Sequence, residues 1–157
     1  MKKTAMIMSI VLALCLFAGC GDKKATSDAS ANVAGTLPEI MVKLYDGVKA
    51  ELPKTMDMEI TEENSEMFLG VAKSEYKEAL ASDAMINAVA HSVCLVRANS
   101  ADEAAALAKT IEEKADPRKW ICVEAEKKIV ATKGDLVVLI MTYADAAAEI
   151  EANFNKL

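Results

Sequence analysis

The chain has little of what catalytic sites commonly need. It contains one histidine, His91, and its aromatic residues are one tryptophan, three tyrosines and three phenylalanines. A nucleophile that relies on a histidine base would have to use His91, and no serine is framed by glycines as in a nucleophile elbow. Paired carboxylates for glycoside hydrolysis would have no aromatic platform beside them. We therefore expect a protein that is not an enzyme.

The chain also lacks a basic surface. It carries 18 Lys and Arg residues against 24 Asp and Glu residues, which gives a formal net charge of -6 at pH 7. Nucleic acids and anionic membrane surfaces both attract proteins through clusters of Lys and Arg. We therefore expect no nucleic-acid partner, and attachment to a membrane would need a device other than a basic patch.

The first twenty residues supply such a device. Lys2 and Lys3 are followed by an apolar run that ends in Phe17-Ala18-Gly19-Cys20. A positive start, an apolar stretch of about 7–15 residues and small residues at its end are typical of a secretory signal peptide. The run is also shorter than the roughly 20 residues that span a bilayer. The sequence thus predicts export from the cytoplasm.

The same segment resembles the lipobox of bacterial lipoproteins, with Phe17 as a departure because the usual leucine stands one place earlier, at Leu16. In that family the cysteine thiol is diacylated, for example with palmitate, and cleavage leaves it as the new N-terminus. The resemblance implies lipid attachment at Cys20, and two acyl chains are enough for stable anchoring. It also implies a location on the extracytoplasmic face of the cell membrane. An ordinary signal peptide and an uncleaved anchor are the alternatives.

Composition divides the chain into three parts. Residues 1–19 are the expected signal peptide, and residues 20–35 are small and polar, which predicts a lipid-anchored flexible tether. Such a tether has a typical span of roughly 20 Å. Residues 36–157 are long enough for a single domain. Beyond the anchor only Cys94 and Cys122 remain, and they form either one disulfide or two buried thiols.

Apolar residues that recur with the period of a helix predict five helices. The first and fourth begin with capping boxes, Thr36 with Glu39 and Ser100 with Glu103, and Thr61 is the expected cap of the second. The expected helices cover residues 37–52, 62–69, 74–81, 101–115 and 143–157.

Three further segments predict strands. Residues 88–98 are apolar and β-branched without a helical stripe. Residues 127–132 and 136–142 flank Lys133-Gly134-Asp135, which indicates a hairpin turn. Because residues 136–142 show no polar alternation, we expect that strand to be central and buried on both faces. A crossover through the helix between the first two strands then predicts an α+β fold. Its three-stranded antiparallel sheet has the order 88–98, 136–142, 127–132, with helices on at least one face.

The segment Ala-Asp-Pro-Arg-Lys-Trp-Ile-Cys-Val at residues 115–123 precedes this hairpin. Together with the lipobox and the tether, it resembles an uncharacterised family of clostridial-type lipoproteins that carry a domain of unknown function after the anchor. The resemblance covers most of residues 37–157. It implies no catalytic residue.

Two short patterns suggest chemistry but have simpler explanations. His91 and Cys94 have the spacing of half a metal site, yet residues three apart on a strand point to opposite faces. Cys122 would have to supply a third ligand. Ser74 and Lys77 match Ser-x-x-Lys, but the companion motifs of enzymes that use it are missing. We predict no catalytic residue, no metal site and no cofactor.

Acidic residues gather between residues 57 and 66, without the spacing of a calcium-binding loop. Glu62 and Glu63 are explained by the dipole of the helix that we expect to follow. The cluster consists of Asp57, Glu59, Glu62, Glu63 and Glu66.

Methionine and the single tryptophan indicate where a partner would bind. Met56-Asp57-Met58 has the spacing of a Cu(I) pair, although methionine more often fills gaps in a core. An adaptable methionine-lined groove suits a protein partner, and Trp120 is either a core lid or a contact residue. We therefore expect an interaction surface around Met56, Met58, Met67 and Trp120. The predicted function is a non-enzymatic binding module for a protein or cell-envelope component. The alternative is a small-molecule or metal-binding accessory lipoprotein, for example of a transporter.

Overall fold

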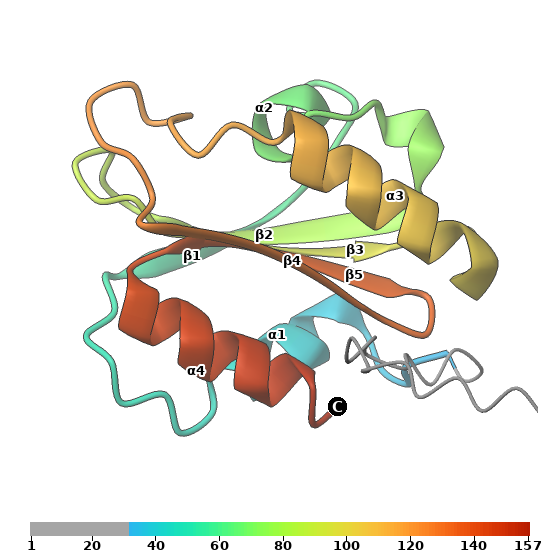
Figure 1. Ribbon diagram of the computed structural model, residues 1–157, viewed down its shortest axis with the longest axis horizontal. Helices are drawn as coiled ribbons and strands as arrows, with labels where there is room; N and C mark the ends of the chain where they lie inside the picture. Colours follow the sequence, from blue (N-terminus) through green and yellow to red (C-terminus); the bar gives the residue numbers. More distant parts are fainter. Residues whose placement is uncertain (1–31) are drawn as a thin grey trace, which may run out of the picture.

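The computed structural model describes residues 32–157. The expected signal peptide, Cys20 and most of the expected tether lie outside these residues. The described part is an α+β fold in which an antiparallel sheet has helices on both faces (Figure 1). The sheet contains five strands in the order β1-β2-β3-β5-β4.

The elements follow one another in a mixed order along the chain. They are α1 (Leu37–Tyr45), β1 (Thr55–Glu59), α2 (Ser65–Leu69), a 3-10 turn η1 (Lys73–Glu75), β2 (Glu78–Ala84), β3 (Ser92–Arg97), α3 (Ala101–Lys114), β4 (Lys127–Lys133), β5 (Leu136–Thr142) and α4 (Ala144–Phe154). The predicted strand order is confirmed as the β3-β5-β4 part of the sheet, with antiparallel pairing on both sides of β5. The strand expected over 88–98 is shorter, because β3 covers Ser92–Arg97. All seven residues of β5 are buried.

The expectation of a three-stranded sheet is wrong, because β1 and β2 complete it. Residues predicted as a helix over 74–81 form only the end of η1, and β2 begins at Glu78. The sequence of β2, Glu-Ala-Leu-Ala-Ser-Asp-Ala, is poor in the β-branched and aromatic residues that favour strands. Pairing with β1 on one side and β3 on the other decides its conformation.

Two helix boundaries also differ from the expectation. Helix α1 ends at Tyr45 instead of Leu52, because Asp46 is extended and Gly47 has a φ of +67°. Glycine adopts this left-handed conformation at little cost, so the helix breaks although the apolar spacing continues. Thr61 does not cap α2; its backbone N–H donates to the side chain of Asn64, which is the residue before the helix. The capping box at Thr36 is confirmed; at Ser100 the hydroxyl caps the helix by accepting from the N–H of Glu103, while the Glu103 side chain accepts from Asn99 instead of closing the box.

Each face of the sheet carries its own core. Helices α2 and α3 cover one face, and α1 and α4 cover the other (Figure 1). The α2–α3 face buries Phe68, Leu107, Ile111, Cys94, Val96 and Leu139 among others. The α1–α4 face buries Ile40, Leu44, Ile150, Phe154, Val93 and Val138 among others. Because helices cover both faces of the sheet, the connections between elements run mainly at its two ends.

Lysines of the edge strand β4 fasten a helix end on each face. The Nζ of Lys128 donates to the carbonyls of Glu112 and Ala115 at 2.7 and 3.1 Å, at the end of α3. The Nζ of Lys133 donates to the carbonyl of Asn155 at 2.9 Å, at the end of α4. A cation at a helix C-terminus satisfies free carbonyls and complements the helix dipole.

Candidate functional site

The two ends of the sheet differ in character. Strand β3 runs toward Arg97 and β5 starts opposite it, so Arg97 and the predicted hairpin turn, confirmed at Gly134, lie at one end. We call this the hairpin end. The connections 46–54, 85–91 and 115–126 and the start of α4 meet at the other end, which we call the loop end (Figure 1).

At the hairpin end Arg97 holds the segment that leads into the domain. Its side chain is buried and contacts Glu78 and Asp135, each at 2.8 Å. The same guanidinium donates to the carbonyls of Val33 and Gly35 at 3.2 and 2.9 Å. The Asp135 carboxylate in turn accepts from the backbone N–H of Val33 at 3.2 Å. These five residues, the Arg97 clamp, fix the chain where it joins the domain.

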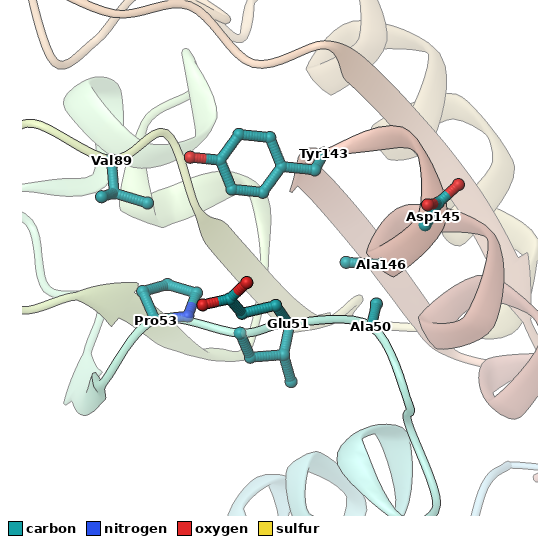
Figure 2. Close-up of a pocket in the computed structure, with 8 residues that line it drawn as sticks. Ala50, Glu51, Pro53, Val89, Tyr143, Asp145 and Ala146 are labelled. Carbon is teal, nitrogen blue, oxygen red and sulfur yellow. The ribbon is translucent and has the colours of Figure 1, made fainter.

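At the loop end lies a pocket of about 460 Å³, the Glu51 pocket. In Figure 2 the Glu51 carboxylate points into the space beneath the Tyr143 ring, whereas the Asp145 carboxylate is directed away from it. The other walls are mostly apolar, and no Lys, Arg or His lines the pocket. Its lining residues are Ala50, Glu51, Leu52, Pro53, Val89, Tyr143, Asp145 and Ala146.

A second pocket of about 500 Å³, the Tyr45 pocket, adjoins the first through Leu52 and Pro53. It lies between α1 and the strands β1 and β2, and its polar lining includes Tyr45, Asp57 and Ser82. The two pockets together form a depression that is open to solvent and carries carboxylates on its rim.

Behind the Tyr45 pocket, His91 is fully buried and bonded on both ring nitrogens. Its Nε2 lies 2.9 Å from the Tyr45 hydroxyl and its Nδ1 lies 2.8 Å from Oγ1 of Thr142. Burial lowers the pKa of His91 to about 4 and raises the pKa of Tyr45. The neutral imidazole has one donor and one acceptor nitrogen, and both are used. This arrangement stabilises the fold and leaves no free base.

The prediction that His91 and Cys94 point to opposite faces is confirmed. His91 bonds to Tyr45 on the α1–α4 face, while Cys94 belongs to the core under α2 and α3. Cys94 and Cys122 are both free, with Cys94 buried and Cys122 exposed, so neither expected alternative, one disulfide or two buried thiols, is correct. Among residues 32–157 no three His, Cys, Asp or Glu side chains are grouped so as to hold a metal ion.

Sequence reasoning missed a buried cation on the α2–α3 face. The Nζ of Lys119 lies 2.9 Å from Asp83 and 3.0 Å from Oγ of Ser92, and 3.8 Å from the centre of the Phe68 ring. A lysine beside a serine is an arrangement that some nucleophilic enzymes use. Here Lys119 is ion-paired and Ser92 is fully buried, so no substrate reaches the hydroxyl. The group joins the 115–126 connection to the ends of β2 and β3.

The four predicted interaction residues do not form one exposed surface. Met56 and Met67 are exposed, and Met58 is half-buried against the α2–α3 core. Trp120 is only 6 % exposed. Its Nε1–H is the one buried side-chain polar group in the described part that has no hydrogen-bond partner. Of the two alternatives for Trp120, its burial supports the core lid.

Exposed apolar side chains that sequence reasoning missed gather at the loop end. Met85 and Ile86 lie in the connection after β2, and Ile121, which is 84 % exposed, lies in the connection before β4. Ile121 has a φ of +70°, a conformation that is an outlier for a β-branched residue. Backbone strain of this kind tends to mark functional segments. The periodic spacing of apolar residues predicts helices and strands but says nothing about loops, so sequence reasoning did not identify these loop residues.

No family model, no curated protein and no solved structure matches this chain. Within the described residues no helix has the length and apolarity needed to cross a membrane. The assignments to lipoprotein families stay predictions from the sequence.

Proposed function

We propose that the protein is a membrane-anchored extracytoplasmic lipoprotein whose domain is a non-enzymatic binding module of the cell envelope. One observation carries the proposal: the Arg97 clamp and the exposed apolar loops lie at opposite ends of the sheet. A tether attached to Cys20 would leave the domain at the hairpin end. The loop end would then face away from the membrane, toward a partner protein or another envelope component.

The separation of the two ends supports this orientation. Strand β3 has six residues between the loop end and Arg97, which at about 3.3 Å per residue is roughly 20 Å. Single exposed apolar residues are ordinary on protein surfaces. At the loop end, however, Met85, Ile86 and Ile121 lie in connections that meet near the Glu51 pocket, which the Tyr45 pocket adjoins, as expected of a recognition surface.

Site-specific photo-cross-linking tests the proposal. A photoreactive amino acid is placed at Ile121 or Met85 of the full chain, in membranes of a producing cell. We expect the same cross-linked species from both positions. The matched control is Asn99, which is exposed at the hairpin end, and it should give none. No product from the loop end, or an equal product from Asn99, would contradict the proposal.

The two pockets favour a second candidate, a small-molecule-binding accessory lipoprotein. Their volumes, about 460 and 500 Å³, fall within the roughly 300–1,000 Å³ of known ligand sites. A thermal-shift screen of the chain against metabolites and metals tests it, because a ligand stabilises by RT ln(1 + [L]/Kd). A stabilisation that Leu52→Trp abolishes would favour this candidate, since Leu52 lines both pockets.

A further inference from the structure

We infer that the Glu51 pocket binds the side chain of a lysine or arginine in an exposed segment of the partner protein. This inference rests on the proposed function and deepens it, because it names the chemistry by which the partner is recognised.

The Glu51 carboxylate, which points into the pocket, favours a cation, whereas the Asp145 carboxylate lies on the rim and is directed away (Figure 2). Its charged lining residues are Glu51 and Asp145, both exposed, and none is basic. Neither carboxylate takes part in an ion pair among the described residues. The net charge of -6 adds a long-range attraction for a basic partner.

The remaining walls match the rest of a basic side chain. Tyr143 is 40 % exposed, and in Figure 2 its ring stands across the opening from the Glu51 carboxylate. The ring is seen nearly face-on in Figure 2, so a basic side chain that lies across its face and reaches the Glu51 carboxylate gains both a cation–π contact and an ion pair. Leu52, Pro53 and Val89 offer apolar surface for the alkyl stem, which lysine and arginine bury readily.

The surroundings of the pocket favour a protein segment over a free amine. The backbone N–H of Val89 donates to the carbonyl of Ile86 at 3.4 Å, so the pocket wall and the exposed apolar Met85 and Ile86 belong to one turn. Apolar residues beside the basic residue of a partner would cover these side chains. A small free amine would leave them in water.

Saturation-transfer-difference NMR on the full chain in deuterated nonionic detergent tests the inference. The probe is the peptide acetyl-Ala-Leu-Lys-Leu-Ala-amide, and the matched peptide has norleucine in place of lysine. We expect the lysine methylene protons to receive the strongest saturation. We expect the norleucine peptide to bind about 3- to 10-fold more weakly, from loss of an exposed ion pair and a cation–π contact.

Variants locate the binding on the molecule. Glu51→Gln and Tyr143→Leu should each lower the affinity for the lysine peptide about 3- to 10-fold. The control Glu66→Gln changes an exposed glutamate on α2, on the other face of the sheet, and should leave the affinity unchanged.

Several results would overturn the inference. These are no binding of the lysine peptide, equal binding of the norleucine peptide, or an affinity that Glu51→Gln leaves unchanged. Free cadaverine binding as tightly as the peptide would overturn the assignment to a protein segment. If these tests fail while Ile121 still cross-links specifically, only the inference is wrong; if the loop-end cross-links are also absent, the proposed function fails with it.

Discussion

At the scale of single residues, His91 shows how a residue that suggests chemistry serves the fold instead. Its two nitrogens are bonded to Tyr45 and Thr142, and it is fully buried. A neutral histidine held in this way opposes protonation, because the charged form would lose hydration and one acceptor. The single histidine of the chain therefore gives the protein a pH-dependent stability without giving it a catalyst.

The stability of the protein should fall on mild acidification because of His91. Burial lowers the folded-state pKa of His91 from 6.5 to about 4, so the unfolded chain takes up a proton first. Stability is fully present above the unfolded pKa and declines as the pH falls toward the folded pKa. Between pH 7.5 and 5 we expect a loss of about 2 kcal/mol in the free energy of unfolding. Urea denaturation at both pH values measures it.

His91→Gln is the control for this prediction. Glutamine does not titrate, so its unfolding free energy should change little over the same pH range. An equal loss in the variant would assign the pH dependence to other groups and contradict the role of His91.

At the scale of elements, the helices are placed by a few close backbone approaches. Gly70 ends α2 with a φ of +71°, and a Cβ built on it would lie 2.6 Å from the backbone carbonyl carbon of Lys114. The end of α2 therefore sits directly on the end of α3. Lys128 ties that same end of α3 to the sheet. Together these contacts keep the α2–α3 face closed.

Gly70→Ala should be strongly destabilising. The substitution combines a left-handed backbone, which costs about 1–2 kcal/mol for an L-residue, with an overpacking cost of about 1–3 kcal/mol. Gly47→Ala is the matched control, since Gly47 also has a left-handed φ but a Cβ there meets nothing within 4 Å. Chemical denaturation of both variants separates the two costs. Equal losses of stability would show that the contact with α3 is unimportant.

At the scale of the whole molecule, the Arg97 clamp and the loop end define an axis. The clamp joins β2, β3, the hairpin turn and the segment before α1 in one charge network, in which Arg97 and Asp135 are buried and Glu78 is exposed. This network orients residues 33–35 relative to the sheet. The clamp thereby fixes the end of the sheet at which the proposed tether would leave, opposite the proposed recognition surface.

Breaking the clamp should free the segment before α1. Arg97→Met leaves Asp135, which is 6 % exposed, as a buried carboxylate without its partner, and removal of one member of such a pair costs about 3–5 kcal/mol. The double variant Arg97→Met with Asp135→Asn should recover part of this loss. Limited proteolysis at residues 33–36 measures the release. A single variant as resistant to protease as the original chain would contradict the clamp.

The anchor itself has a direct test. Cys20→Ala should abolish incorporation of radiolabelled palmitate in the producing cell, because the thiol is the proposed acylation site. Cys122→Ala is the control, since Cys122 is an exposed thiol in the described part of the chain, and it should leave the incorporation unchanged. Palmitate that still labels Cys20→Ala would show the lipobox interpretation to be wrong.

Short-range patterns were sufficient for a large part of the fold. The caps at Thr36 and Ser100, the hairpin at Gly134 and the buried strand β5 are all confirmed. Each depends on residues within a few positions of one another, where hydrogen-bonding side chains, glycine dihedrals and apolar runs act locally. Their order along the chain was also enough to place β5 between β3 and β4.

Contacts between distant residues settled the rest. β2 is a strand because of its neighbours on both sides, against its own weak propensity. Glu51 and Tyr143 line one pocket, and Arg97 holds Val33, although these partners lie far apart in sequence. Such pairings depend on how the layers pack. The free energy of this packing cannot be read from the spacing of apolar residues within one helix or strand. Helix, hairpin and central strand are thus properties of short segments, whereas the clamp and the loop-end pocket exist only in the folded chain.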